Sequence, residues 1–148
     1  MKYFTLSIFL IICFTKNATS QENLSYDHLA IIVKDVDVSA DFYENILGLK
    51  EIYCPLDLTI RRWFSMGGPI QLHLIEEEKL DIPRHKSSHF ALKTTNFDGL
   101  LKTLKDKEIQ YSTWDGKKGE FTIRPDGVRQ IYIQDPDENW IEINERKM

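Results

Sequence analysis

Residues 27–34 read DHLAIIVK, and residues 88–93 repeat the pattern as SHFALK. Successive side chains of a β-strand point to opposite faces, so Leu29, Ile31 and Val33 share one face of the first stretch. The histidine of each stretch lies on the other face. These stretches predict two equivalent strands about 60 residues apart, each with one face turned toward a core.

The same order of elements follows each of these strands, namely a helix and three further strands. The first helix is expected over residues 38–47, with Asp37 or Ser39 as its N-cap. The apolar residues expected on its buried face are Val38, Phe42 and Ile46. The three strands expected after it are Lys50–Cys54, Arg61–Met66 and Ile70–Glu76.

In the second half, Asn96 is expected to cap a helix whose apolar stripe is Phe97, Leu100, Leu101 and Leu104. The strands expected after this helix are Ile109–Trp114, Val128–Gln134 and Trp140–Asn144. Residues 135–139 (DPDEN) have the composition of a turn, and residues 115–125 are rich in Gly and Lys and are expected to form a loop or lid.

The two halves, about 26–80 and about 87–146, are too small to bury their sheets separately. We therefore expect one α+β domain over residues 21–148. In it, two βαβββ modules lie side by side and form an open, barrel-like mixed sheet with the helices outside.

The first 20 residues resemble a cleaved export signal, with a positive start, an apolar run and small residues before the expected cut after Ser20. The alternative is an uncleaved N-terminal anchor. The run, Tyr3 to Phe14, is shorter than the roughly 20 residues of a membrane span, so no stable membrane insertion is expected after cleavage. The sequence thus predicts an exported protein, periplasmic or secreted.

Cleavage would remove two lysines and no acid, which leaves 17 basic and 23 acidic residues and a net charge of −6. Such a chain offers no basic patch for phosphates, so nucleic acid is not an expected partner. Cys13 would leave with the signal, and Cys54 would remain as a single cysteine without an intrachain disulfide.

Four potential metal ligands lie on the first and last strands of the two halves, and by the strand period all four face away from the helices. They are His28, His73, His89 and Glu142. A carboxylate in such a concavity requires a positive partner, and imidazole with carboxylate suits Zn, Ni, Fe, Mn or Co. Taken singly, each histidine has an ordinary structural explanation, and Glu142 could pair with Arg61, Arg62 or Arg129. His85 lies in the linker and is expected to be solvated.

The sequence resembles the vicinal oxygen chelate superfamily, which includes glyoxalase I, extradiol dioxygenases and antibiotic resistance proteins. The stretches that carry the resemblance are Asp27–Ile31, Asp41–Leu49, Ser88–Leu92, Asp135–Asp137 and Trp140–Glu142. The resemblance implies one divalent metal ion held by the same four residues, a small-molecule substrate or ligand, and a homodimer. It leaves open whether one site lies within a single chain or draws on both chains.

Similarity to glyoxalase I implies a lyase or isomerase in which the metal polarises paired substrate oxygens. Glu142 would then be both ligand and proton acceptor, and His73 is the second candidate for acid–base chemistry. Two positions depart from that pattern: Ile32 stands where glyoxalases have a glutathione-binding arginine, and His73 stands where they often have a glutamate.

Two alternatives remain. In a dioxygenase, His28, His89 and Glu142 would form a two-histidine, one-carboxylate Fe(II) site. In a non-catalytic, resistance-type binding protein, the cup would only hold a small molecule. The aromatic residues that could line it are Trp63, Phe64, Trp114 and Tyr132. One arginine of the rim could clamp an anionic group, among Arg61, Arg62, Arg124 and Arg129, of which at least two are expected to be surface charges.

Overall fold

The computed structural model describes residues 25–79 and 83–146, and the predicted signal at residues 1–20 lies outside them. Module one consists of β1 (His28–Val33), α1 (Val36–Asp41), the π-helical turn η1 (Phe42–Ile46), β2 (Lys50–Ile52), β3 (Arg61–Ser65) and β4 (Gln71–Glu76). Module two consists of β5 (His89–Thr94), α2 (Phe97–Asp106), β6 (Tyr111–Ser112), β7 (Thr122–Ile123), β8 (Arg129–Gln134) and β9 (Trp140–Glu145).

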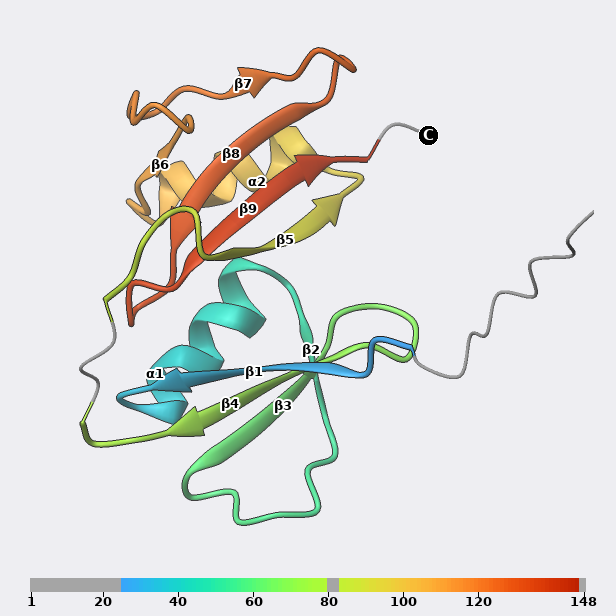
Figure 1. Cartoon of the computed structure of the whole chain (residues 1–148), viewed down its shortest axis with the longest axis vertical. Helices are drawn as coiled ribbons and strands as arrows, with labels where there is room; N and C mark the ends of the chain where they lie inside the picture. The colour runs from blue at the N-terminus through green and yellow to red at the C-terminus, as the bar shows by residue number, and fades with distance from the viewer. Residues whose placement is uncertain (1–24, 80–82, 147–148) are drawn as a thin grey trace, which may run out of the picture.

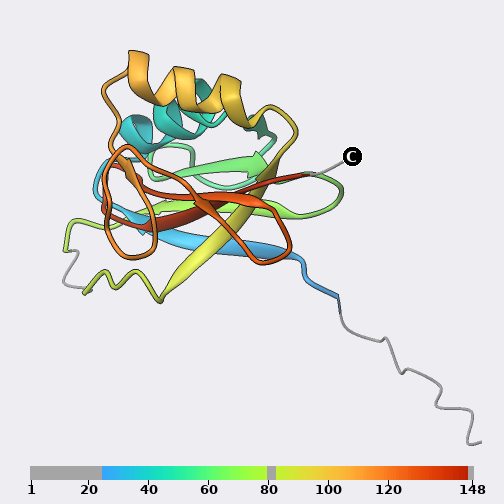
Figure 2. The ribbon, with the colours of Figure 1, turned by 90° about the horizontal axis from the view of Figure 1, so that it is seen from above.

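Each module folds its strands into one mixed sheet (Figure 1). The order is β1-β4-β3-β2 in module one and β5-β9-β8-β6 in module two, where β7 also pairs with β8. In both sheets the first strand is parallel to the last, and the others pair antiparallel. The helices of both modules lie on one side of the strands (Figure 2). The predicted pair of βαβββ modules is confirmed, with two curved sheets that do not close into a barrel.

The first helix begins two residues earlier than the sequence pattern indicated. Asp35 is its N-cap, and its carboxylate accepts from the backbone N–H groups of Asp37 and Val38, both at 3.0 Å. The backbone N–H of Val36 donates to the Glu76 carboxylate of β4 at 2.9 Å. The predicted caps, Asp37 and Ser39, were therefore wrong, because a contact with β4 fixes the start of the helix.

The earlier start also changes the buried face of this helix. Val36, Phe42 and Tyr43 are buried, whereas Val38, which was expected in the core, is 52% exposed. Adjacent residues of an α-helix point about 100° apart, and the π-helical turn η1 lets Phe42 and Tyr43 both face inward. In module two the expected cap is confirmed: Asn96 Oδ1 accepts from the Gly99 N–H at 3.1 Å.

The stretch 115–125 is not entirely a loop, because Thr122 and Ile123 form β7 against Gln130 and Arg129 of β8. Among the described residues, no helix has the length and apolar content needed to cross a membrane.

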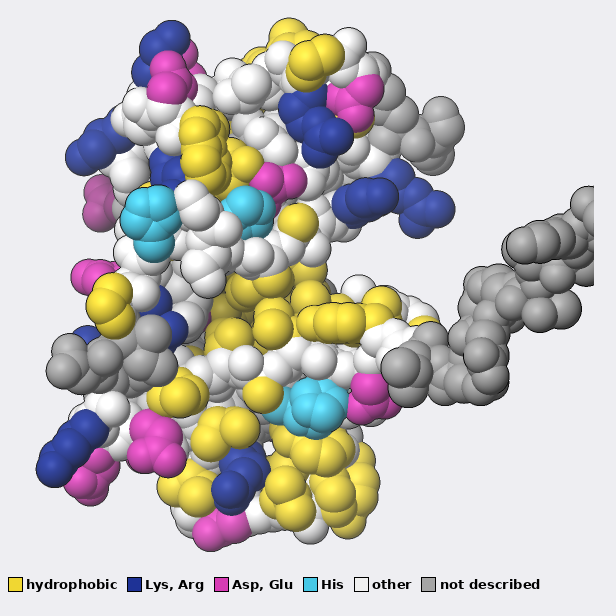
Figure 3. Space-filling view, in the orientation of Figure 1, with side chains coloured by type: hydrophobic (Ala, Val, Ile, Leu, Met, Phe, Trp, Pro, Cys, Tyr) yellow, Lys and Arg dark blue, Asp and Glu magenta, His cyan; other side chains and the backbone are white. Residues whose placement is uncertain are grey.

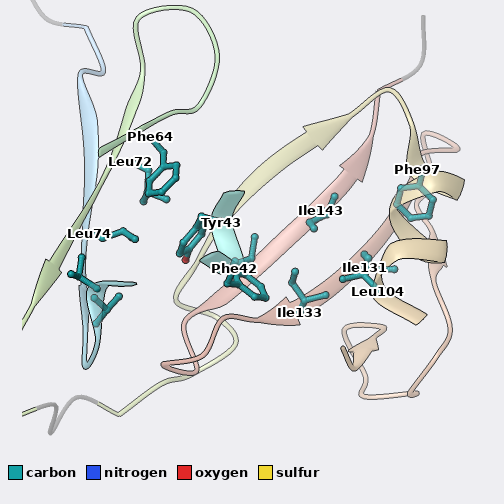
Figure 4. Packing of buried hydrophobic residues seen from close by; sticks show 13 residues of the cluster. Phe42, Tyr43, Phe64, Leu72, Leu74, Phe97, Leu104, Ile131, Ile133 and Ile143 are labelled. Atoms are coloured by element: carbon teal, nitrogen blue, oxygen red, sulfur yellow. The ribbon is translucent and has the colours of Figure 1, made fainter. Parts of the chain in front are cut away.

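One hydrophobic cluster runs through both modules (Figure 4). Phe42 and Tyr43 of η1 lie between Leu72 and Leu74 of the first sheet and Ile133 of the second, so this turn packs against both sheets. The two modules therefore share a core, as the small size of each half required.

The turn between β8 and β9 joins the modules through a buried carboxylate. Asp135 accepts from the backbone N–H groups of Asp137 and Asn139, from the Asn139 side-chain amide, and from the Tyr43 hydroxyl at 2.8 Å. Burial raises the pKa of Asp135 and also that of Tyr43. Asp137 accepts from the Ser39 hydroxyl at 2.9 Å. The turn at residues 135–139 thus holds module two to the first helix, a role that its composition did not indicate.

Replacing Tyr43 with phenylalanine should weaken this joint, because it removes one of the donors to the buried Asp135 carboxylate. We expect the free energy of unfolding to fall by about 1–3 kcal/mol, measured by urea denaturation. The matched control is Tyr53→Phe, since Tyr53 is 85% exposed and should show no change. Equal unfolding midpoints for the two variants would contradict the role given to Tyr43.

Candidate functional site

The two modules place their candidate ligands in the same register. His73 of β4 lies opposite Ala30 of β1, and Glu142 of β9 lies opposite Ala91 of β5. Each alanine is two residues past the histidine that begins its strand. The histidine of the first strand and the ligand of the last strand therefore occupy equivalent positions in each module.

The equivalence extends to the next strand of each sheet. Trp63 of β3 lies opposite His73, and Tyr132 of β8 lies opposite Glu142. Each module thus carries three equivalent side chains: a histidine on its first strand, a candidate ligand on its last strand, and an aromatic residue on the strand beside it.

In module one, the ring of His73 is stacked between two other rings. His28 lies on one side, with ring centroids 4.2 Å apart, and Trp63 on the other, at 3.9 Å. Leu72 and Leu74, the neighbours of His73 along β4, are fully buried on the opposite face, as the strand period predicted. Burial, followed by the charge of His28, lowers the pKa of His73, so this imidazole is neutral at neutral pH and has a lone pair to offer.

In module two, the carboxylate of Glu142 is buried and surrounded by polar groups. His89 Nε2 lies 3.2 Å from Glu142 Oε2, the hydroxyl of Tyr132 donates to the same oxygen, and Asn144 Nδ2 donates to Oε1 at 2.6 Å. Burial alone would raise the pKa of Glu142, but the hydrogen bonds from Tyr132 and Asn144 outweigh it and lower the pKa. The side chain is therefore an ionised carboxylate at neutral pH.

Each of the three candidate histidines has one ring nitrogen next to an acceptor oxygen. The pairs are His28 Nδ1 with Asp27 Oδ2 at 2.6 Å, His73 Nε2 with Gln71 Oε1 at 2.8 Å, and His89 Nδ1 with the Lys86 carbonyl at 2.7 Å. In a neutral imidazole, the nitrogen facing an acceptor carries the proton, and the other nitrogen is left as a lone pair. This arrangement is typical of metal-binding histidines. The chemistry of the donors therefore fits a divalent metal ion.

The four candidate ligands form two half-sites: His28 with His73, and His89 with Glu142. Within residues 25–79 and 83–146, no three His, Cys, Asp or Glu side chains gather as a metal site. Histidine side chains appear on both sides of an apolar hollow on one face of the molecule (Figure 3). One chain thus brings the ligands together in pairs, and the meeting of the two pairs stays a prediction.

A groove of about 1020 Å³ separates the modules. Its lining includes Leu29 of β1, Met66 and Ile70 of the β3–β4 hairpin, and Phe90 and Leu92 of β5. Both β1 and β5 are edge strands of their sheets, and each contributes residues to the groove.

Three of the four aromatic residues proposed as pocket lining lie on the ligand face. Trp63 stacks on His73, and Trp114, which is 50% exposed, contacts the rings of His89 and Tyr132. Phe64 is fully buried in the shared core and cannot line the site. This residue was wrongly included, because its neighbours on β3 give no apolar–polar alternation that would identify its face.

The arginines divide between the two faces of the sheets. Arg62 pairs with Asp37 of the first helix, and Arg129 is bound by Asp98 of α2 and by Glu145. These two guanidiniums stabilise the contacts between helices and sheets, and each is held by acidic side chains rather than lying free on the surface.

Arg124 differs from them, since its Nη1 donates to Asn144 Oδ1 at 3.3 Å, on the face that carries Glu142. Asn144 and Gln71 were not among the site residues predicted from the sequence. Both are two residues from a ligand on the same strand, so the strand period contained the signal needed to find them.

The family model described as "Glyoxalase/Bleomycin resistance protein/Dioxygenase superfamily" matches residues 25–143. The uncharacterized protein YwbC of Bacillus subtilis (strain 168) is 31% identical over 127 residues, which cover 81% of this chain and 96% of YwbC. The protein named glyoxylase I 4 of Arabidopsis thaliana is 28% identical over 127 residues, 80% of this chain and 69% of that protein.

The chain also has the same fold as a solved structure that is named for antibiotic resistance rather than for glyoxalase activity. The fosfomycin resistance protein FosX of Listeria monocytogenes aligns with a TM-score of 0.65 and 20% identity, over 84% of this chain and 95% of FosX. The match of the family model over most of the chain, together with the repeated modules, shows that this protein belongs to the glyoxalase/bleomycin resistance/dioxygenase, or vicinal oxygen chelate, superfamily.

Proposed function

We propose that this protein is an exported, metal-dependent lyase or isomerase of the glyoxalase type that acts on a small molecule. Its ligands are His28, His73, His89 and Glu142. The observation that carries the proposal is the state of these four groups: each imidazole has one nitrogen held by an acceptor, and the carboxylate is kept ionised by two donors. A solvent-facing structural histidine does not need such an arrangement.

In this proposal, the complete site forms between two copies of the chain, with the half-site on β1 and β4 of one copy facing the half-site on β5 and β9 of the other. Two features support it. Each half-site has only two donors, fewer than the three protein ligands of a typical catalytic metal site. Both β1 and β5 are edge strands beside an apolar groove, which is the kind of surface that a second chain covers.

A bound divalent ion would act as a Lewis acid on paired oxygens of the substrate. Glu142, ionised and fixed by Tyr132 and Asn144, is placed to accept a proton from a substrate carbon or hydroxyl near His89. Trp114 lies against His89 and Tyr132, where it would exclude water from that side of the substrate. Ile32 offers no charge for glutathione, which favours a substrate other than a glutathione adduct.

A ring-cleaving Fe(II) dioxygenase is the second candidate, and one observation favours it. His73 is covered on both faces by the rings of Trp63 and His28. If His73 were a positioning group, His28, His89 and Glu142 would remain as the two-histidine, one-carboxylate set that leaves positions open for oxygen. Iron in the purified protein, with oxygen uptake on catechols, would identify this reaction.

We expect the purified protein to bind close to one divalent ion per chain, and His28→Ala and Glu142→Gln each to abolish stoichiometric binding, because each removes one of four ligands. Metal content is measured by mass spectrometry after zinc or nickel loading and dialysis. The matched control is His85→Ala, a linker histidine outside the site, which should keep its metal. If both His28→Ala and Glu142→Gln retained the metal, the proposed metal centre would be wrong.

Mixing variants should show whether the site is shared. When His28→Ala and Glu142→Gln chains are unfolded together and refolded, half of the dimers are mixed and each has one intact site, so metal binding should return to about one quarter of the wild-type level. A mixture of His89→Ala with Glu142→Gln, both in module two, should recover none. Absence of recovery in the first mixture would place all four ligands in one chain.

A further inference from the structure

Three basic side chains line one end of the groove between the modules, namely Lys93, Arg124 and Arg146. Of the acidic residues in the same lining, Asp126 pairs with Arg124 at 3.0 Å, and Glu145 is bound by a guanidinium on the helix side. Three cations against the two carboxylates of Asp126 and Glu145 leave one positive charge in excess, in a chain whose net charge is −4. Dark blue side chains gather at one end of the apolar hollow in Figure 3.

This basic end lies two residues along the strands from the half-site on module two, although neither His89 nor Glu142 lines the groove itself. Lys93 lies on the same face of β5 as His89 and is paired with Asn144 of β9. Glu142 is paired with Ala91, two residues before Lys93. Two residues of a strand span about 6.6 Å. A molecule held at His89 and Glu142 would therefore meet the basic residues with a group roughly four or five bonds beyond its reacting atoms.

Arg124 connects the two regions through hydrogen bonds. It donates to Asn144 Oδ1 at 3.3 Å, and the amide nitrogen of Asn144 donates to Glu142. Its side chain is 40% exposed, compared with 24% for Arg129, which is held by two carboxylates. Arg124 is thus fixed in position while its remaining N–H groups stay accessible to a solute, which is the geometry required to bind an oxyanion.

We infer that Lys93, Arg124 and Arg146 form a subsite for an oxyanion, so that the substrate is a small molecule with an apolar body and a carboxylate or phosphate-type group. The apolar body suits the walls made by Leu29 and Phe90. This inference rests on the proposed function for its link to the metal ligands, but the anion subsite itself requires no metal.

The test is calorimetric titration of the EDTA-treated protein with three phenyl compounds of similar shape: phenylacetate, phenylphosphonate and the neutral phenylacetamide. Both anions should bind at least about tenfold more tightly than the amide, and added salt should weaken only the anions. Arg124→Gln and Lys93→Gln should each weaken anion binding by about fivefold or more. Lys102→Gln, on the exposed face of α2, is the matched control and should not change it.

Equal affinity for the amide and the anions, or unchanged anion affinity in both groove variants, would overturn the subsite. Arg124 also pairs with Asp126, so Arg124→Gln could disturb the loop; Lys93→Gln removes only an exposed amine and keeps the test decisive. The titration uses metal-free protein, so its result does not depend on the metal site. If the protein binds the anions but fails to load metal, only the proposed function is rejected. Metal loading without anion binding would reject only this inference.

Discussion

The buried carboxylate of Asp135 is the constraint on which the arrangement of the molecule depends. Two backbone amides, one side-chain amide and the Tyr43 hydroxyl all donate to it, which compensates for the cost of placing an acidic group in the interior. Asp137, two residues later, holds Ser39 and the backbone N–H of Lys34. The β8–β9 turn therefore fixes how the second sheet sits on the first helix. It thereby fixes the distance between the two half-sites, although it lies in neither.

The face of each ligand could be predicted from sequence because it depends on a local property. Strand side chains alternate, so the apolar neighbours of His73 and of Glu142 showed which way these residues point. The start of the first helix could not be predicted in this way. Three residues of the capping type, Asp35, Asp37 and Ser39, lie within five positions, and the choice is made by Glu76, a residue 40 positions later that binds the N–H of Val36.

Which residues belong to the site was harder to predict than the sheet face on which they lie, because membership of the site depends on partners that are distant in the sequence. Nothing local separates Arg129, which two acidic side chains hold on the helix side, from Arg124, which reaches the ligand face. Likewise, the repeat indicates which strands carry the candidate ligands, but not whether the half-sites that would meet belong to one chain or to two. That depends on how the edges of β1 and β5 are covered, which is a property of assembly rather than of strand pattern.

The π-helical turn at Phe42–Ile46 has a consequence for how sequences of this family can change. The N–H of Leu47 reaches back five residues to the carbonyl of Phe42, at 3.3 Å, so this turn contains one residue more than an α-helix would. Deleting a single residue here would restore a regular α-helix, in which adjacent residues point about 100° apart, so that Phe42 could stay in the core only if Tyr43 moved out of it. The Tyr43 hydroxyl would then turn away from Asp135. Insertions and deletions should therefore be far rarer in this segment than in the loop of residues 113–121, whose described hydrogen bonds are made largely within the loop itself.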